Sequence, residues 1–431
     1  MNTSRHCYLA AALGIGALGL LLSGCGKKPS VTVPRPTLEK TTVEWATDRY
    51  VATPIGKAGE GPPWISHVRI ADLDQDGRND VLACDDKALT VLWLRQVAPG
   101  QFEETVLAEQ LPAPVHVEAV DMDADGDLDL LVSCMGQVFP NNDHIGSLLI
   151  LENDGAQNFT PRVVAENVMR VTDARAADFD GDGLLDLAVA QFGYDQGEIR
   201  WMRNRGDGTF ESKVLLSLSG AINVCVADMN GDRALDIVAV VSQQWEEVHY
   251  FENSGSGYFT DRILFGSTNE DYGSSGISLS DINRDGRMDV LYTNGDGFAY
   301  ADPGKRPWHG LQWLENLGQG AFKFHRVGDM PGAYSPVGAD LEGRGVMDIV
   351  SVSGFNDWQN PDAISLVVFR NDGTNNFTMQ VLAKQPVQLI SCDVGDLTGD
   401  GIPDIVAGAF HSYPPYEKMG RLTLWTARKS P

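Results

Sequence analysis

The stretch that decides the fold is Asp178-Phe179-Asp180-Gly181-Asp182-Gly183-Leu184-Leu185-Asp186. Related stretches with the same spacing begin at Asp72, Asp121, Asp228, Asp281, Asp340 and Asp396. The seven copies recur at intervals of roughly 50 to 60 residues, and each lies between two apolar runs. A motif that recurs in this way predicts a repeat architecture, in which each repeat buries its neighbour and all of them form one body.

The residues between these Asp loops predict four strands per repeat. One strand precedes the loop and one follows it. A third ends in a turn bearing Asn and Gly, such as Asn153-Asp154-Gly155, and a phenylalanine such as Phe159 opens the fourth. Short strands with turn residues between them are typical of propeller blades. The sequence therefore predicts an all-β, seven-bladed propeller of four-stranded antiparallel blades over residues 43–431.

The last repeat ends before its fourth strand. Its third strand is expected at Leu422-Thr423-Leu424-Trp425, and no phenylalanine-led strand follows. At the other end of the chain, Trp45–Val51 aligns with Phe159–Val164. We therefore expect this N-terminal strand to complete the last blade and close the ring, since closure removes exposed sheet edges.

Composition limits the class of partner. The chain has 431 residues and a formal net charge of −26. This charge argues against a nucleic-acid partner, because phosphate binding needs clustered Lys and Arg. Many of the carboxylates lie in the seven loops, where bound cations would neutralise part of the charge.

Residues 1–24 have the features of a targeting segment, with Arg5 before an apolar run that is too short for a confident membrane span. The run ends in Leu22-Ser23-Gly24-Cys25, which resembles the bacterial lipobox. This resemblance implies that Cys25 is the lipidated first residue and that the membrane is a partner. The alternative is an ordinary secretory peptide in which the cysteine occurs by chance. Gly26, in place of Asp, implies the outer membrane of a bacterial cell envelope. Residues 25–42 are expected to tether the anchor to a monomeric propeller.

Four cysteines follow the tether: Cys84, Cys134, Cys225 and Cys392. All four fall in predicted strands, where a buried thiol behaves as a small hydrophobic group. A disulfide among them is possible in an oxidising compartment, and its pairing cannot be deduced from sequence.

The Asp loop has the chemistry of a cation site. Side-chain oxygens stand at positions 1, 3, 5 and 9, and a glycine at position 6 permits a sharp turn with positive φ. Converging carboxylates repel one another unless a hard cation such as Ca²⁺ lies between them. Position 12, where an EF-hand places its glutamate, holds no acid in any copy, for example Val189.

The Asp-x-Asp-x-Asp-Gly-x-x-Asp pattern with flanking strands resembles the FG-GAP/VCBS repeats of integrin α-subunit propellers and of bacterial surface proteins. The resemblance implies Ca²⁺ bound between the first and second strands of a blade. The implied ligands in four loops are Asp72, Asp74, Asp76 and Asp80; Asp121, Asp123, Asp125 and Asp129; Asp178, Asp180, Asp182 and Asp186; and Asp281, Asn283, Asp285 and Asp289.

Three loops depart from the pattern. Two of them keep four oxygen-bearing side chains: Asp228, Asn230, Asp232 and Asp236, with Arg233 in place of glycine, and Asp396, Thr398, Asp400 and Asp404. The sixth loop carries Arg344 at position 5, and we expect its guanidinium to bridge the remaining carboxylates in place of a metal. Altogether, about four to six structural Ca²⁺ ions are expected.

If the Asp loops mark one face, the loops between second and third strands form the other. These loops mix aromatic and polar side chains, which suits a glycan or protein ligand. The candidate ligand-binding residues are Phe192, Tyr194, Trp245, Phe298, Tyr300, Asp302, Trp308, His309, Phe355, Asp357, Trp358, His411 and Tyr413. Each of these aromatic residues taken singly is more simply explained as loop packing.

Three functions remain open. The first is a noncatalytic, lipid-anchored binding or adhesion module. The second is a carbohydrate-active enzyme, a polysaccharide lyase or hydrolase, with Asp302, His309, His411 or Tyr413 near the ring axis. The third is an architectural envelope protein. No nucleophile elbow, phosphate loop or zinc signature is present, and a propeller fold alone does not decide among the three.

Overall fold

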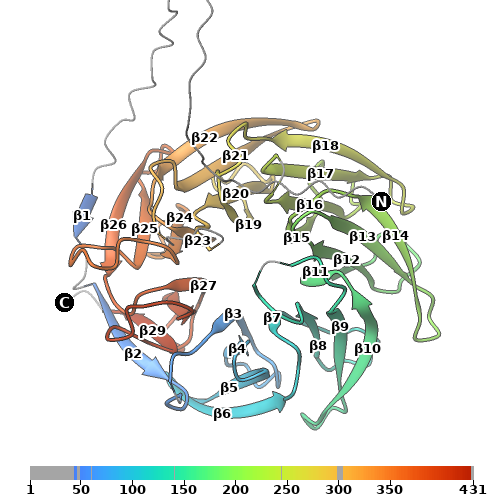
Figure 1. Cartoon of the computed structure of the whole chain (residues 1–431), viewed down its shortest axis with the longest axis horizontal. Coiled ribbons are helices and arrows are strands. Elements are labelled where there is room, and N and C mark those ends of the chain that lie inside the picture. Colours follow the sequence, from blue (N-terminus) through green and yellow to red (C-terminus); the bar gives the residue numbers. More distant parts are fainter. Residues whose placement is uncertain are drawn as a thin grey trace, which may run out of the picture. The chain divides into compact units, whose positions relative to one another are not determined.

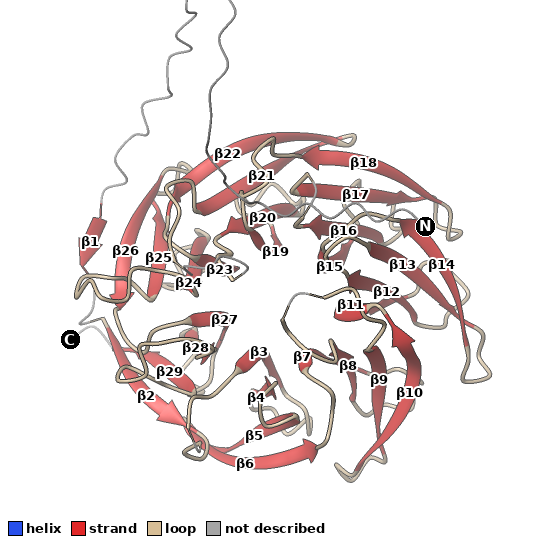
Figure 2. Cartoon of the chain, in the orientation of Figure 1, coloured by secondary structure: helices blue, strands red, loops and turns tan. Residues whose placement is uncertain are grey.

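Seven sheets, six with four strands and one with five, stand around a central axis like the blades of a propeller (Figures 1 and 2). The computed structural model describes residues 43–45, 49–59, 61–139, 141–243, 245–298 and 304–428. The targeting segment, Cys25, the tether, Tyr300 and Asp302 lie outside the described residues. The described part of the chain is built from strands, and it contains no helix long and apolar enough to cross a membrane.

Blades 1 to 6 are each built from four consecutive strands and blade 7 from three C-terminal strands and one N-terminal strand, and the first strand of each repeat lies nearest the axis (Figure 1). Blades 1 to 4 are β3 (Ile65–Ala71), β4 (Asp80–Asp85), β5 (Thr90–Ala98) and β6 (Gln101–Ala108); β7 (Pro114–Val120), β8 (Asp129–Cys134), β9 (Gly146–Asn153) and β10 (Phe159–Val168); β11 (Arg170–Ala177), β12 (Asp186–Phe192), β13 (Gly197–Asn204) and β14 (Phe210–Leu216); and β15 (Ala221–Ala227), β16 (Asp236–Val241), β17 (Glu247–Asn253) and β18 (Phe259–Phe265).

Blades 5 to 7 are β19 (Ser274–Ser280), β20 (Asp289–Asn294), β21 (Gly310–Gly318) and β22 (Ala321–Asp329); β23 (Ala333–Ala339), β24 (Asp348–Ser353), β25 (Leu366–Asn371) and β26 (Phe377–Ala383); and β27 (Leu389–Gly395), β28 (Asp404–Ala409), β29 (Leu422–Ala427) and β2 (Tyr50–Ile55). The predicted all-β, seven-bladed fold is confirmed.

The core lies between the blades. The second strand of every blade is buried along its whole length, because neighbouring blades cover both of its faces. Each of the seven blade–blade interfaces contains a cluster of buried apolar side chains. The interface of blades 7 and 1, for example, packs Val68 and Leu92 with Val406 and Leu424. Burial between repeats is therefore what makes one body of seven motifs.

The N-terminal strand closes the ring as predicted, but with a different register. β2 pairs antiparallel with β29, from Tyr50 opposite Ala427 to Ile55 opposite Leu422. The predicted strand Trp45–Val51 begins five residues too early, because Tyr50 holds the place that Phe159 has in β10. The Tyr50 ring joins the buried cluster between blades 6 and 7, and this packing selects the register. Upstream, β1 (Val43–Trp45) pairs in parallel with β26 of blade 6.

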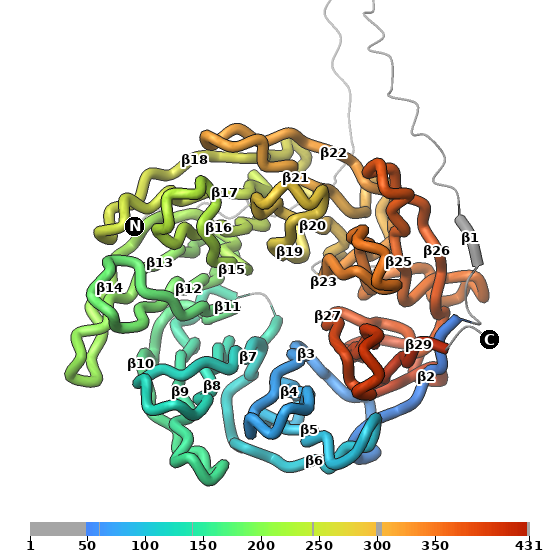
Figure 3. Tube along the Cα trace, turned by 180° about the vertical axis from the view of Figure 1, so that it is seen from behind, coloured from blue at the N-terminus to red at the C-terminus, as the bar shows by residue number. Residues whose placement is uncertain are grey.

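The topology separates two faces. In every blade the ninth residue of the Asp loop is the first residue of the second strand, as Asp186 is of β12. The second strand then runs to the opposite end of the blade. The loops that follow it therefore lie on the face away from the Asp loops. Figure 3 shows the ring from behind the view of Figure 1.

The four cysteines lie in strands β4, β8, β15 and β27, as predicted, and all are free. Cys84, Cys134 and Cys392 are buried, and Cys225 is partly buried. Burial raises the pKa of the Cys134, Cys225 and Cys392 thiols to about 12. These thiols thus serve as small packing groups.

Candidate functional site

The first aspartate of each loop holds the turn together. The Asp178 carboxylate accepts backbone hydrogen bonds from Gly181 (2.7 Å) and Gly183 (2.9 Å). Gly183, at position 6, has a φ of 86°. In the fourth loop Arg233 takes the same conformation, with a φ of 75°, and its N–H donates to Asp228 (2.8 Å). The loop geometry thus overrides the cost of a non-glycine residue there.

The ninth aspartate of each loop is buried and links the loop to the third strand of its blade. Asp186 accepts hydrogen bonds from the backbone N–H of Phe179 (3.3 Å), the indole Nε1–H of Trp201 (3.0 Å) and the backbone N–H of Asn204 (2.7 Å). These donors come from the loop and from the third strand, so one carboxylate joins both. Burial raises the pKa of the equivalent Asp80, Asp236 and Asp289 to about 6.

The recurrent residue at the end of the third strand is the partner of this aspartate. Its backbone N–H donates to the ninth carboxylate in six blades, from Gln96, Asn153, Asn204, Asn253, Asn316 and Asn371. The Asn204 side chain also donates to the carbonyl of Leu185 (3.1 Å). Sequence reasoning assigned these asparagines only to turns, although their recurrence was the available signal.

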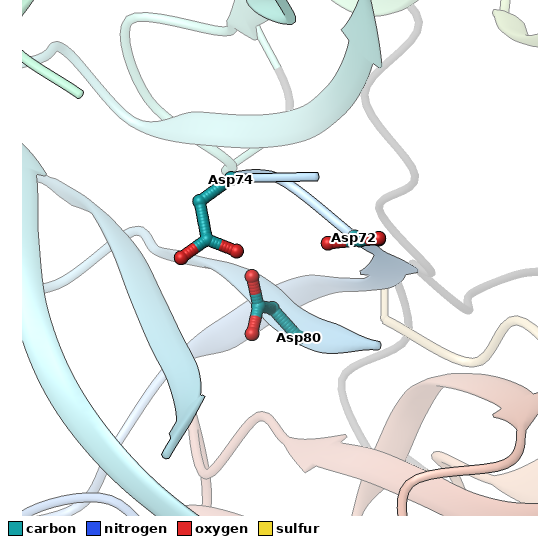
Figure 4. A group of neighbouring side chains, drawn as sticks. All are labelled: Asp72, Asp74 and Asp80. Carbon is teal, nitrogen blue, oxygen red and sulfur yellow. The ribbon is translucent and has the colours of Figure 1, made fainter. Parts of the chain in front are cut away.

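Three loops bring carboxylates together as a metal site requires. The groups are Asp72, Asp74 and Asp80; Asp121, Asp123 and Asp125; and Asp178, Asp180 and Asp186, and within each group the oxygens lie within 4.8 Å of one another. Figure 4 shows the first group, with Asp74 and Asp80 turned toward each other and Asp72 beside them. Clustered carboxylate oxygens are the donors that Ca²⁺ prefers, so these three clusters could hold a metal ion.

The fifth loop, which was also expected to bind Ca²⁺, differs from these three. The described residues give no carboxylate triplet between Asp281 and Asp289. The Asn283 amide nitrogen donates to Asp285 (3.0 Å) and to Glu315 (3.4 Å). Here the amide oxygen of Asn283, in place of a carboxylate, would have to face a cation.

One position near the end of the third strand is positively charged in some blades and negatively charged in others. The residue before the recurrent Asn or Gln is arginine in blades 1, 3 and 6 (Arg95, Arg203, Arg370) and glutamate in blades 2, 4 and 5 (Glu152, Glu252, Glu315). Arg95 Nε lies 2.5 Å from Asp74 Oδ2, and Arg203 Nη2 lies 3.0 Å from Asp182 Oδ2. These guanidinium groups therefore pair with loop carboxylates that would otherwise be free to bind a metal ion.

The sixth loop carries two arginines. Arg344 Nε lies 2.7 Å from Glu342 Oε2, and its Nη2 lies 3.1 Å from Asp348 Oδ1. The predicted bridging of carboxylates by Arg344 is confirmed. Arg370, which sequence reasoning missed, pairs with the same two acids, with its Nη1 2.8 Å from Asp348 Oδ2. The carboxylates of this loop are thus neutralised by the chain itself.

The comparisons with known proteins bear on these loops. The family model described as "FG-GAP-like repeat" matches residues 72–132, 178–239 and 228–292, each of which begins at the first aspartate of a loop. These three stretches lie in blades 1 to 5, so parts of the propeller are similar to FG-GAP-like repeats. No curated protein matches the sequence.

Solved structures resemble this propeller at low identity. Two are of BBS1N in complex with ARL6DN. The lead-soaked crystal gives a TM-score of 0.52 at 11% identity, covering 88% of this chain and 97% of that one. The mercury-soaked crystal gives 0.50 at 12%, covering 91% and 99%. The V. cholerae biofilm matrix protein Bap1 gives 0.44 at 12%, covering 90% and 91%. At these identities the BBS1N likeness supports the fold alone.

A cavity of about 250 Å³ lies on the propeller axis at the face opposite the Asp loops. Loops following the second strands of blades 2 to 7 contribute to its wall. Its aromatic side chains are Phe192, Tyr194, Phe298, Tyr334, Phe355 and Phe410. Ring centroids of Phe298 lie 6.1 Å from Phe355 and 6.3 Å from Phe410. We call this cavity the channel mouth.

Polar groups stand among these rings. Asp296 accepts hydrogen bonds from the Tyr334 hydroxyl (2.8 Å) and the Phe298 backbone N–H (2.9 Å), and burial raises its pKa. Arg170 lines the cavity from the start of β11. Sequence reasoning missed Arg170, Asp296, Tyr334 and Phe410, because no motif marks single residues that meet only in the closed ring.

Of the candidate ligand-binding residues, Phe192, Tyr194, Phe298 and Phe355 line the channel mouth. Asp357, Trp358 and Tyr413 line a neighbouring cavity of about 430 Å³. The Trp358 indole packs in a buried cluster, 5% exposed, and its Nε1–H donates to the Tyr413 hydroxyl (3.3 Å). Trp245 lines neither cavity and is 51% exposed.

Two histidines and a tryptophan support the loops instead. His309 Nδ1 accepts the backbone N–H of Arg306 (3.3 Å) and of Gly332 (3.2 Å), and His411 Nε2 accepts that of Gly420 (3.3 Å). Burial lowers the pKa of His309 to about 3 and of His411 to about 4, which keeps both rings neutral. The Trp308 indole donates to the Asp271 carbonyl (2.7 Å).

A second cavity near the axis is lined by His116 and Arg175. Both side chains contact Asp173, and this aspartate links adjacent blades. His116 Nε2 and Arg175 Nε lie 3.3 and 3.2 Å from Asp173 Oδ1. The same aspartate accepts the backbone N–H of Val224 in the next blade (3.2 Å). Burial lowers the pKa of His116 well below its usual value. These groups are engaged in ring assembly.

Proposed function

We propose that this chain is a calcium-stabilised, noncatalytic binding module whose ligand site is the channel mouth. The observation that carries the proposal is the joining of aromatic and polar side chains from six blades around one cavity opposite the Asp loops. Aromatic walls with a few fixed polar groups are typical of ligand sites, and ring faces beside hydroxyl and amide groups suit a sugar.

The Asp loops have a supporting role in this proposal. They lie at the far end of each blade, so a bound ion would not touch a ligand in the mouth. Asp121, Asp123 and Asp125 fit Ca²⁺ best, because no arginine pairs with them in the described residues. A bound ion would stabilise the native ring by linkage. Calcium removal should therefore lower the melting temperature, which calorimetry with and without chelator measures.

The ligand-site proposal is tested with a glycan array and a peptide pull-down in the presence of Ca²⁺. The matched variants are Tyr194→Ala, which alters an exposed ring at the mouth, and Tyr258→Ala, which alters an exposed ring in the turn between β17 and β18 at the Asp-loop end. We expect Tyr194→Ala to weaken binding and Tyr258→Ala to leave it unchanged. Equal effects, or no ligand at all, would favour the architectural function.

Anchoring in the cell envelope belongs to the same proposal. It rests on the lipobox-like Leu22-Ser23-Gly24-Cys25, and an outer-membrane lipoprotein would hold the propeller within reach of envelope glycans. Cys25→Ser should prevent incorporation of labelled fatty acid and release the protein from the membrane fraction. Unchanged labelling would contradict the lipid anchor.

A carbohydrate-active enzyme is the second candidate, favoured by one observation. Asp296 and Tyr334, hydrogen-bonded at 2.8 Å, stand in the mouth as a carboxyl and a phenol that acid–base catalysis can use. His309 and His411, expected for this role, bind backbone groups instead. Turnover of an acidic or neutral polysaccharide that Tyr334→Phe abolishes would establish the enzyme over the binding module.

A further inference from the structure

Arg170 is held in a fixed position in the wall of the channel mouth. Its Nη1 donates to the carbonyls of Gln137 (3.3 Å), Val138 (3.3 Å) and Phe139 (2.9 Å). The guanidinium carbon lies 4.5 Å from the ring centroid of Phe192. The residue is only 1% exposed. A long side chain is therefore ordered before any ligand arrives, so little further entropy is lost when a ligand binds.

The other edge of the same guanidinium has no partner. Nε and Nη2 of Arg170 are buried without a hydrogen bond, and no carboxylate of the described residues forms an ion pair with it. Burial lowers its pKa to about 10, while the negative charge of Asp143 acts in the opposite direction. The group is still a cation at neutral pH. An uncompensated buried charge is costly, so an anion that binds this edge of the guanidinium would be stabilised.

The free edge selects the kind of anion. Nε–H and Nη2–H point in parallel from one side of a guanidinium and match the two oxygens of a carboxylate. Across the cavity, Asp296 is committed to Tyr334 and Phe298 and can still accept from a hydroxyl. A ligand with a carboxylate at one end and hydroxyls at the other would satisfy both.

We propose that the channel mouth recognises a carboxylated sugar unit, a hexuronate residue of an acidic glycan. The carboxylate binds Arg170, the apolar face of the ring packs on Phe298, Phe355 and Phe410, and hydroxyls reach Asp296 and Gln243. A cavity of about 250 Å³ suits one ring of this size. This inference rests on the proposed binding function and names its ligand class.

The test compares matched ligands on the full-length protein with Ca²⁺. The probes are galacturonate oligosaccharides, the same oligosaccharides after reduction of the carboxyl groups to alcohols, and peptides with free or amidated C-termini. We expect the acidic sugar to bind about tenfold or more tightly than its reduced form, since a charge-assisted bidentate contact is lost. This comparison needs no variant and is independent of any effect on folding.

Variants of Arg170 complete the test. Arg170→Gln should remove the preference, so that the acidic and reduced sugars bind this variant with equal affinity, and Arg170→Lys should keep only part of the preference, because an ammonium cannot form the paired contact. Equal binding of acidic and reduced sugars would overturn this inference and leave the binding function standing. Preference for the free peptide carboxylate would overturn the sugar class. Failure of every probe would overturn the binding function with it.

Discussion

Arg203 Nη2 lies 3.0 Å from Asp182 Oδ2, so the third strand of blade 3 places its own cation on the loop that resembles a calcium site. In blade 2 the corresponding residue is Glu152, which pairs outward with Arg162 of the fourth strand. The blades thus differ in how their loop carboxylates are neutralised, and a metal must compete with a guanidinium in one loop but not in the other.

This competition predicts the ranking of the metal sites. Arg203→Glu should raise the Ca²⁺ affinity of the third loop, because a cation is removed and an oxygen donor is added. Glu152→Arg, the reverse change, should weaken the second loop. Calorimetric titration of each variant measures both, and an increase in the second variant would contradict the charge argument.

We predict that replacing a ninth aspartate lowers the stability of the protein even when no metal is bound. In Asp186→Asn the amide nitrogen must face one of the N–H donors from Phe179, Trp201 or Asn204, which leaves buried donors unpaired. We expect the free energy of unfolding to fall by about 1–3 kcal/mol in the absence of Ca²⁺. Denaturant unfolding measures it, with Asp180→Asn as the control. If both variants behave alike in chelator, Asp186 acts only through the metal.

The closing strand predicts a sharp dependence on where the N-terminus is cut. Among the described strands, removal of residues up to 45 takes away only β1 at the edge of blade 6, and should reduce the melting temperature little. Removal up to Ile55 takes away β2, including Tyr50, exposes β29 and uncovers the apolar cluster between blades 6 and 7. This longer truncation should lower the melting temperature cooperatively. Similar melting temperatures for the two truncations would contradict closure by β2.

Glu246 predicts a pH-dependent stability. The side chain is 2% exposed, accepts the backbone N–H groups of Gly273 (3.1 Å) and Ser274 (2.8 Å), and has its pKa raised by burial from 4.5 to about 7. Because the folded-state pKa is raised, its contribution to stability is fully present below about pH 4.5 and is lost as the pH rises through about 7.

Comparison with Glu246→Gln isolates this effect. The stability of the wild type relative to the variant should fall between these pH values by roughly 1 to 3 kcal/mol. Chemical denaturation at several pH values measures the difference. A constant difference across the range would show that the ionisation of Glu246 is not coupled to folding.

The sequence predicted the fold well because the fold repeats. Seven Asp loops with flanking apolar runs gave the number of blades, the order of strands and the face on which the loops lie. The turn conformation at Gly183 and Arg233 and the bridging by Arg344 also followed from local spacing, since these contacts join residues a few positions apart. Such contacts leave a pattern in the chain.

What only the tertiary structure decided joins residues far apart in sequence. The register of β2 against β29 depends on the packing of Tyr50 between blades 6 and 7, whereas the alignment with Phe159–Val164 placed Trp45 at this position. Arg203 and Arg370 reach the loops from a neighbouring strand. Arg170 and Asp296 meet in one cavity only because blades 3 and 5 stand around the same axis. Non-periodic contacts of this kind arise when the ring closes, and the chain carries no local signal for them.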